Sequence, residues 1–364
     1  MVLIEHDPAG ENTARWYNVI HTFTEGYVKN SAKLTALGIY PIGAYADKEH
    51  GGVKFFQSMS HGANNLYGAM GRNMTILGNY LNDASLQHLA QRNAQFIIGL
   101  NPGIPNAYEA TKWTSVSFIY GLGTNYFTPT SGDAPLGSGI NGFTAANQFE
   151  EKDIWDNEDL PLGILYENGD YQFNEDYLPH GMAYIGAAVL TEAPYRLTIR
   201  TKTAATVTVQ TEKGQISVYE TDAQDELILT ELPLGQTIMV TATDGTVTTQ
   251  STFAAVGGGS DTWTVDFENC LRLRISAPGV ISGQSQAFIT MTNAGSKAIS
   301  VDLSVLCDGI QIRSNAIMQE LAPGEEVTVT VDIVSEGSTK PYVLMARAVH
   351  GDLTTTVSLE GFAQ

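Results

Sequence analysis

The sequence predicts a multidomain α + β protein in which a helical domain precedes two all-β modules. Hydrophobic residues recur at every third or fourth position in the first part of the chain, as in amphipathic helices. From about residue 197 onward they alternate with polar residues, as in half-buried strands. At 364 residues the chain is long enough for two or three hydrophobic cores. We therefore expect domains at residues 1–196, 197–256 and 261–364.

Four helices are expected in the first domain. One begins at Asn12–Thr13, and three cover residues 63–81, 83–98 and 178–190. Apolar side chains share one face of the first and last of these helices. They are Trp16, Val19, Ile20, Phe23 and Tyr27 in the first helix, and Leu178, Met182, Ile185 and Val189 in the last.

A long passage rich in glycine and aromatic residues, about 103–173, separates the third and last helices. So much irregular chain in a compact domain usually carries function. Residues 150–176 hold ten carboxylates and one lysine. Oxygen ligands in Asp153–Asp159 could hold a structural Ca²⁺, although EF-hand spacing is absent; the alternative is a solvated acidic loop.

Both β modules consist of short alternating strands with turn residues between them. The segments 205–210 and 237–241 are examples from the first module. The second module has the length and strand spacing of an immunoglobulin-like sandwich. The intervening Gly257–Ser260 is typical of a flexible linker.

The net charge of −20 is spread along the chain, with 20 acidic and 10 basic residues up to position 196 and 19 and 9 after it. Nucleic acid is excluded as a partner, because binding phosphates requires a basic face. No run of about 18 apolar residues occurs, so no membrane-spanning helix is expected. The first residues are too polar for a signal peptide. An extracellular or cell-surface location is expected, and it would require a targeting signal that is not visible on this chain. Cys270 and Cys307 could form one disulfide or remain two buried thiols.

Four segments resemble family 9 glycoside hydrolases in order and spacing. They are Ala90–Pro102, Ser117–Thr124, Leu136–Gly142 and Phe173–Glu175 with the helix that follows. The resemblance covers roughly residues 55–195. It implies an (α/α)6-barrel-type helical domain in which Glu175 is the general acid.

Two motifs of that family are missing. No Asp-Ala-Gly-Asp motif supplies the catalytic base, and Tyr126–Pro129 stands where the family has His-His-Arg. The chain therefore resembles only the C-terminal half of such a barrel. The base would come from outside the recognised segment, for example from a second chain, with Asp47 or Glu49 as alternatives within this chain.

Glu175 could also act as an acid on physical grounds, because neighbouring carboxylates such as Asp170 and Asp176 would raise its pKa. Its alternative role is to cap the last helix. Flat rings and polar side chains nearby are candidates for binding sugar, although each could instead hold loops onto helices. They are Trp113, Tyr120, Tyr126, Trp155, Tyr171, His61 and His180. Neither a metal site nor a cofactor is expected, since the histidines lack metal-ligand spacing.

The sequence thus predicts a glycoside hydrolase that cleaves a poly- or oligosaccharide by general acid/base catalysis, with inversion. The alternative is a non-catalytic carbohydrate-binding or cell-surface structural protein, which a half barrel without its base would fit. An open half barrel would expose an apolar helix face, so a homo-oligomer or a second chain that completes the barrel is also expected.

Overall fold

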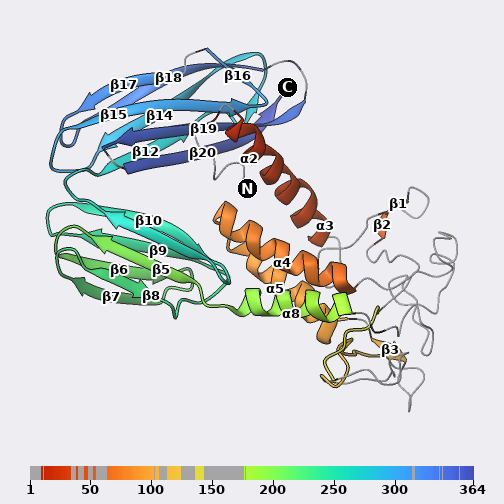
Figure 1. Ribbon diagram of the computed structural model, residues 1–364. Helices are drawn as coiled ribbons and strands as arrows, with labels where there is room; N and C mark the ends of the chain where they lie inside the picture. The colour runs from red at the N-terminus through yellow and green to blue at the C-terminus, as the bar shows by residue number, and fades with distance from the viewer. Residues whose placement is uncertain are drawn as a thin grey trace.

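The fold is known from a computed structural model. It describes residues 10, 12–33, 38–39, 45–47, 52–54, 64–101, 103–105, 113–123, 136–142, 176, 178–313, 316–335, 337, 339–351 and 353–364. Two β-sandwiches lie one above the other, and a layer of helices extends from the same side of both (Figure 1).

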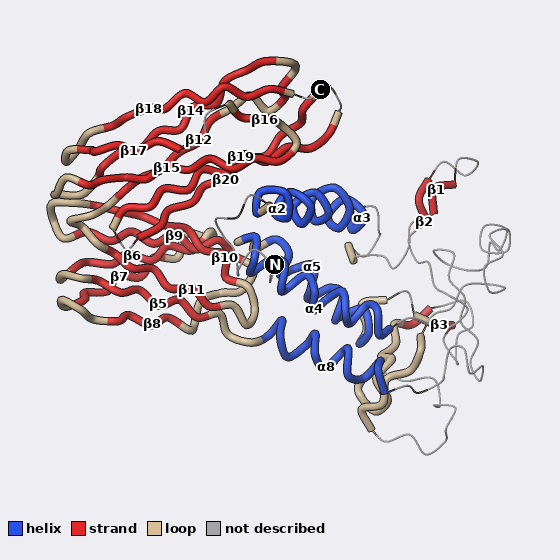
Figure 2. Tube along the Cα trace, turned by 45° about the horizontal axis from the view of Figure 1, so that its top comes forward, coloured by secondary structure: helices blue, strands red, loops and turns tan. Residues whose placement is uncertain are grey.

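The helical layer contains three longer helices that pack side by side and an N-terminal helical segment beside them (Figures 1 and 2). The three are α4 (Asn64–Leu81), α5 (Ser85–Ile98) and α8 (Leu178–Glu192). The N-terminal segment is continuous through α2 (Thr13–Thr22), the π-helical η1 (Phe23–Lys29) and α3 (Asn30–Lys33). Its Val28 and Ala32 pack against Met74 of α4 and Leu86 of α5.

Local chemistry explains where α4 and α5 begin and end. Asn82 has a φ of 52°, which turns the chain after α4. Asp83 Oδ1 accepts hydrogen bonds from the backbone N–H and the hydroxyl of Ser85, at 3.0 and 2.6 Å, as α5 begins. Gly99, with a φ of 147°, ends α5. The α4–α5 pair is therefore a tight helical hairpin.

Two short hairpins lie near the helical layer. They are β1 (Tyr45–Asp47) with β2 (Gly52–Lys54), and β3 (Ile104–Pro105) with β4 (Trp113–Thr114).

The first sandwich has sheets of strand order β10-β9-β6-β7 and β11-β5-β8. Its strands are β5 (Arg196–Thr201), β6 (Ala205–Thr211), β7 (Ile216–Thr221), β8 (Glu226–Leu229), β9 (Gln236–Thr243), β10 (Thr248–Ala255) and β11 (Ser260–Val265). Alternate residues of β6 and β9, such as Val207 and Val240, are fully buried between the sheets. Strand β11 lies after the predicted linker and runs parallel to β5.

The second sandwich has sheets of order β12-β14-β18-β16 and β13-β20-β19-β15-β17. Its strands are β12 (Leu271–Ser276), β13 (Val280–Ile281), β14 (Gln284–Asn293), β15 (Ile299–Asp308), β16 (Gln311–Ile312), β17 (Ala316–Leu321), β18 (Glu326–Val334), β19 (Lys340–His350) and β20 (Leu353–Ala363). Ile289, Leu303 and Leu344 belong to its buried core.

The helical layer contacts both sandwiches. Ala14 of α2 packs against Val343 of β19, and the Asn18 amide donates a hydrogen bond of 2.6 Å to Asp308 Oδ2. On the first sandwich, Gln87 Oε1 accepts a bond of 2.9 Å from the Gly257 N–H. A Cβ at Gly257 would collide with the carbonyl oxygens of α8, so the predicted glycine linker lies against the helices.

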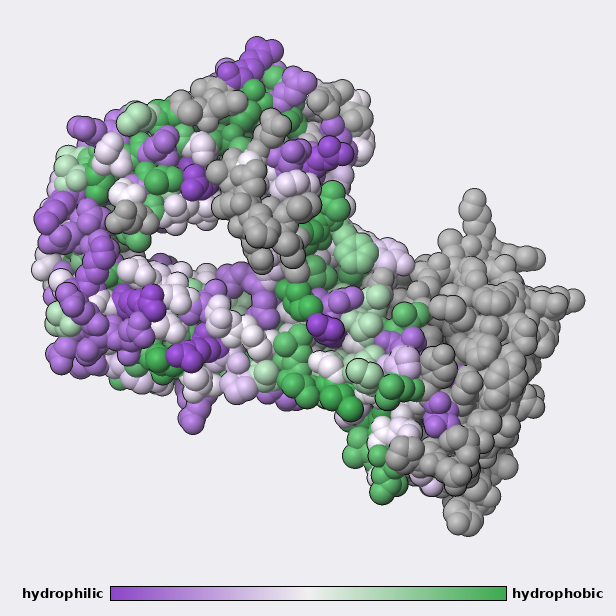
Figure 3. All heavy atoms as spheres, viewed as in Figure 1, coloured by the Kyte–Doolittle hydropathy of each residue, from purple (hydrophilic) through white to green (hydrophobic). Residues whose placement is uncertain are grey.

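The predicted fold class was wrong in its first part. Most of the described secondary structure is strand, and the described helices form an open layer in place of an (α/α)6 barrel. The apolar stripes of α2 and α8 face solvent, with Val19 64% and Met182 62% exposed. Helix α8 instead packs through small residues, such as Ala187 against Gly71 of α4. Hydrophobic surface gathers over these helices (Figure 3).

Candidate functional site

The structure describes only part of the site predicted at the start of α8. Glu175, Asp170, Tyr126, Trp155, Tyr171 and His61 lie outside the described residues. The backbone of Trp113 pairs with Pro105 in the β3–β4 hairpin. Tyr120 is half-buried and exchanges backbone hydrogen bonds with the 137–138 turn. Asp176 forms a β-bridge with Ile140. The catalytic role of Glu175 therefore stays a prediction.

His180 is the predicted site residue with the most complete description. It is buried on α8, and its Nδ1 accepts a hydrogen bond of 2.7 Å from the backbone N–H of Asn65. The ring proton is therefore on Nε2, which donates to Asn141 Oδ1 at 2.7 Å. Burial lowers the pKa of His180 to about 4, so the ring is neutral at pH 7.

Other buried amides hold the same end of the helical layer together. Asn64 donates from its side chain to the Ile140 carbonyl at 3.0 Å. Asn101, just after α5, donates to the Phe96 and Val116 carbonyls and accepts from the N–H groups of Gly103 and Val116. His180, Asn64 and Asn101 thus bind segments 113–118 and 140–141 to the helix ends. The geometry of His180 fits the structural alternative to a sugar contact.

A groove between the two sandwiches is the larger described cleft, with a volume of about 750 Å³. Strands β10, β11 and β12, each at the edge of its sheet, contribute to its walls, together with the β19–β20 turn. Edge strands present a row of backbone groups that their own sheet leaves unpaired. The space-filling view shows open space between the sandwiches (Figure 3). Its lining is rich in hydroxyl groups: Thr249, Ser251, Thr262, Thr264, Thr354 and Thr355.

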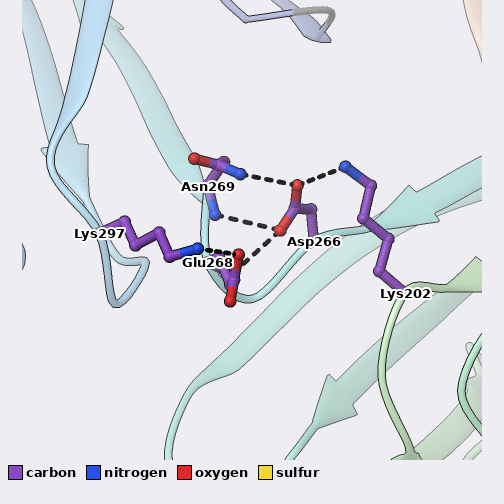
Figure 4. Close-up of polar contacts among 5 residues, drawn as sticks. All are labelled: Lys202, Asp266, Glu268, Asn269 and Lys297. Atoms are coloured by element: carbon purple, nitrogen blue, oxygen red, sulfur yellow. Dashed lines mark hydrogen bonds and ion pairs between the residues drawn. The ribbon is translucent and has the colours of Figure 1, made fainter.

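Asp266 lines this groove, and Figure 4 shows its polar contacts. Its Oδ2 accepts from Lys202 Nζ at 2.6 Å and from the Asn269 amide at 3.0 Å, and its Oδ1 accepts from the backbone N–H groups of Glu268 and Asn269. Burial raises the pKa of Asp266, but these hydrogen bonds outweigh burial, so the pKa lies below its usual value. Lys202 follows β5 and Asp266 follows β11, which are paired strands of the first sandwich, so this network fixes the point where the chain leaves the first sandwich for the second.

Two further side chains that line the groove are Trp263 and His350. Trp263 is half-buried and lines the groove; its ring packs against the core of the first sandwich, tilted by 57° to the ring of Phe253. His350 is only 4% exposed, and its Nδ1 has no hydrogen-bond partner in the part of the chain that the structure describes. Burial lowers the pKa of His350, and the charge of Asp266 opposes this shift. A buried nitrogen without a partner marks a place where a ligand or water hydroxyl would be favoured.

A second cavity of about 510 Å³ lies among α2, the α4–α5 turn and both sandwiches. Its Glu25 and Asp83 carboxylates both pair with Lys29, the first at 2.5 Å. Those charges are already satisfied within the protein.

The sequence-based prediction missed the groove between the sandwiches. Its lining residues come from five strands and from the junction near Asp266, so no local motif marks it. The available signal is the pair Arg272 and Arg274, two cations at alternate strand positions in an acidic chain.

Cys270 and Cys307 are free thiols in the structure. Each is half-buried, and their sulfurs lie near Thr249 Oγ1 and the Ile310 carbonyl, respectively. Among the described residues, no three His, Cys, Asp or Glu side chains are grouped as metal ligands. None of the described helices is both long enough and apolar enough to cross a membrane.

No protein-family model and no curated protein matches the sequence. The resemblance to family 9 glycoside hydrolases is thus overturned as an assignment, because no family match supports it and the described helices do not form the barrel it implies.

Solved structures share β-sandwich elements with this chain at low similarity. Native α-2-macroglobulin from Escherichia coli is 16% identical, with a TM-score of 0.27, over 41% of this chain and 10% of that chain. The CARDB domain of the PF1109 protein from Pyrococcus furiosus is 16% identical, with a TM-score of 0.24, over 28% of this chain and 97% of that domain. The ASH/PapD-like domain of human CEP192 is 11% identical, with a TM-score of 0.21, over 28% and 88%. The matched part of this chain therefore spans about a tenth of the length of the bacterial macroglobulin.

Proposed function

We propose that this protein is a non-catalytic, carbohydrate-binding structural protein of the cell surface, and that it binds sugar in the groove between its sandwiches. The observation that carries the proposal is the groove itself. Its volume of about 750 Å³ falls within the range of about 300–1,000 Å³ that is usual for ligand sites.

The lining suits a sugar. Hydroxyl-bearing side chains can both donate to and accept from sugar hydroxyls. The ring of Trp263 offers a flat apolar surface to the C–H face of a pyranose. The groove therefore combines an aromatic platform with many hydroxyl partners.

The two sandwiches would act as a spacer that holds this groove open. Backbone hydrogen bonds from Ser296 and Lys297 of the second sandwich to the Phe267 and Glu268 carbonyls couple the sandwiches, which limits their relative movement. The acidic composition keeps such a protein soluble outside the cell.

The test is to incubate the full chain with a panel of soluble oligosaccharides and to measure both binding and the release of reducing ends. Binding without release is the expected result. Release of reducing ends that Glu175→Gln abolishes would instead establish the hydrolase predicted from the sequence, and would overturn this proposal.

A matched pair of variants locates the binding site. Thr262 is exposed and lines the groove, whereas Thr246 is exposed on the β9–β10 turn, away from the groove lining. Thr262→Tyr should fill the groove and weaken binding about tenfold or more, and Thr246→Tyr should leave it unchanged. Equal affinity in both variants would show that the sugar binds elsewhere.

A further inference from the structure

The groove between the sandwiches has a charge balance opposite to that of the whole chain. The chain holds 39 acidic and 19 basic residues. Asp266 is the one acidic residue among the described lining residues, which also include Arg272 and Arg274. A local excess of positive charge in an acidic protein calls for a specific explanation.

Arg272 and Arg274 project from the same face of β12. Along β12, Leu271 and Leu273 are buried in the core of the second sandwich, and the two arginines between and after them are exposed. Because successive side chains of a strand alternate between faces, both arginines lie on the outer face, with their Cα atoms about 7 Å apart along the strand.

Neither guanidinium is neutralised by the described residues. Arg272 donates a hydrogen bond of 2.6 Å to the Thr248 carbonyl, which carries no charge. No ion pair involving Arg272 or Arg274 occurs within the described ranges. Asp266 already accepts four hydrogen bonds, so its oxygens have no free capacity for an arginine.

Resting on the proposed function, we infer that the groove selects an acidic oligosaccharide, with Arg272 and Arg274 each binding a sugar carboxylate. A planar guanidinium binds a carboxylate through two parallel hydrogen bonds, a geometry that a neutral sugar cannot offer. The bond to Thr248 holds the Arg272 side chain in place before the ligand arrives, which reduces the entropy lost on binding.

The net charge limits the length of the ligand. A chain of net charge −20 repels a long polyanion, and the groove provides two guanidinium groups. A short oligosaccharide, or the end of a longer chain, with about one carboxylate per arginine therefore fits best.

The experiment compares digalacturonate with its dimethyl ester by calorimetry on the full chain. The two ligands share the same rings and hydroxyls, and only the acid carries charge. Digalacturonate is expected to bind about tenfold or more tightly than the ester. The Arg272→Gln/Arg274→Gln double variant should reduce that preference to about twofold or less, with little change for the ester.

Arg313→Gln is the matched control, since Arg313 is exposed on the second sandwich and does not line the groove. It should leave the preference unchanged, and thermal melting should show that all variants are folded. Equal binding of acid and ester by the native protein would overturn the acidic selectivity and leave the proposed function standing. If the protein bound neither of these ligands nor any of the soluble oligosaccharides in the wider panel, both the acidic selectivity and the proposed function would be overturned. An unchanged acid preference in the double variant would remove the role of the two arginines.

Discussion

The two sandwiches and helix α8 bury opposite kinds of residue. In the sandwiches the larger apolar side chains face inward, as Ile289 and Leu303 do at 0% exposure. In α8 the larger apolar side chains face outward, as Ile185 does at 56% exposure, and small or polar residues such as Ala187 and His180 are buried. Each sandwich therefore has a core of its own, and α4 and α5 share a small apolar core with the N-terminal helical segment, whereas α8 is held by close backbone packing and buried hydrogen bonds.

The largest predicted effect is a difference in stability between the alanine variants of two isoleucines. Ile289→Ala removes buried methyl groups from the second sandwich and should lower the free energy of unfolding by about 3–4 kcal/mol. Ile185→Ala makes the same chemical change on the exposed face of α8 and should alter stability by about 0.5 kcal/mol or less. Urea unfolding followed by circular dichroism measures both.

A large loss of stability in Ile185→Ala would contradict the expected difference between the two isoleucines. It would mean that the stripe on α8 is covered in solution, for example by a second copy of the chain. Light scattering at two protein concentrations would then distinguish a dimer from a monomer.

The next effect concerns the buried histidine of the helical layer. Because the pKa of His180 falls from its ordinary 6.5 to about 4 in the folded protein, the unfolded chain binds this proton more readily. The contribution of neutral His180 to stability is therefore present above pH 6.5 and lost as the pH falls toward 4. The loss is on the order of 3 kcal/mol.

Many carboxylates also titrate in acid, so His180 must be isolated by difference. His180→Gln should be less stable than the native protein at pH 7, because it disturbs the bonds to Asn65 and Asn141. The stability gap between the two proteins should shrink as the pH is lowered from about 7 to about 4. A gap that stays constant with pH would show that His180 is not a buried neutral ring.

The strands of both sandwiches could be predicted from the sequence, because strict alternation of apolar and polar residues is typical of a strand with one buried face. An alternating segment such as β6 must bury one face, and the buried residues of the strand obey the pattern. Helix positions were also predicted well, as for α5 and α8. The sequence could not show which face of a helix finds a partner: Met182 and Val189 form a regular stripe that points to solvent.

The candidate site was harder to predict for a different physical reason. His180 was chosen because it follows Glu175 closely in the sequence, but its role is set by Asn65 and Asn141, which are distant along the chain. The groove near Asp266 is assembled from strand edges of two sandwiches. No periodicity or motif encodes such a junction, because the alternation within each strand reflects only which of its residues face the core of its own sandwich.

A third prediction compares two ion pairs at that junction. Asp266 is 6% exposed and accepts four hydrogen bonds, so Asp266→Ala leaves buried donors without partners and should cost about 2 kcal/mol. The nearby Lys297–Glu268 pair is exposed on both sides, and Lys297→Ala should cost about 0.5 kcal/mol or less. Differential scanning calorimetry should record a lower melting temperature in the first variant alone. Similar losses in both would show that burial at Asp266 does not strengthen the junction.

The smallest predicted effects have opposite signs and test the close packing of the helical layer. A Cβ at Gly68 of α4 would lie 2.7 Å from the backbone carbon and 2.8 Å from the carbonyl oxygen of Ala183, neither of which can move without displacing α8. Gly68→Ala should therefore destabilise the protein by about 1–2 kcal/mol, despite the better helix propensity of alanine. Gly186, on α8 itself, has no atom within 4 Å of its Cβ position, and Gly186→Ala should stabilise the protein by about 0.5–1 kcal/mol. If both variants were stabilised, α4 and α8 would not pack as closely as the structure shows, and the contrast between α8 and the sandwiches would lose its basis.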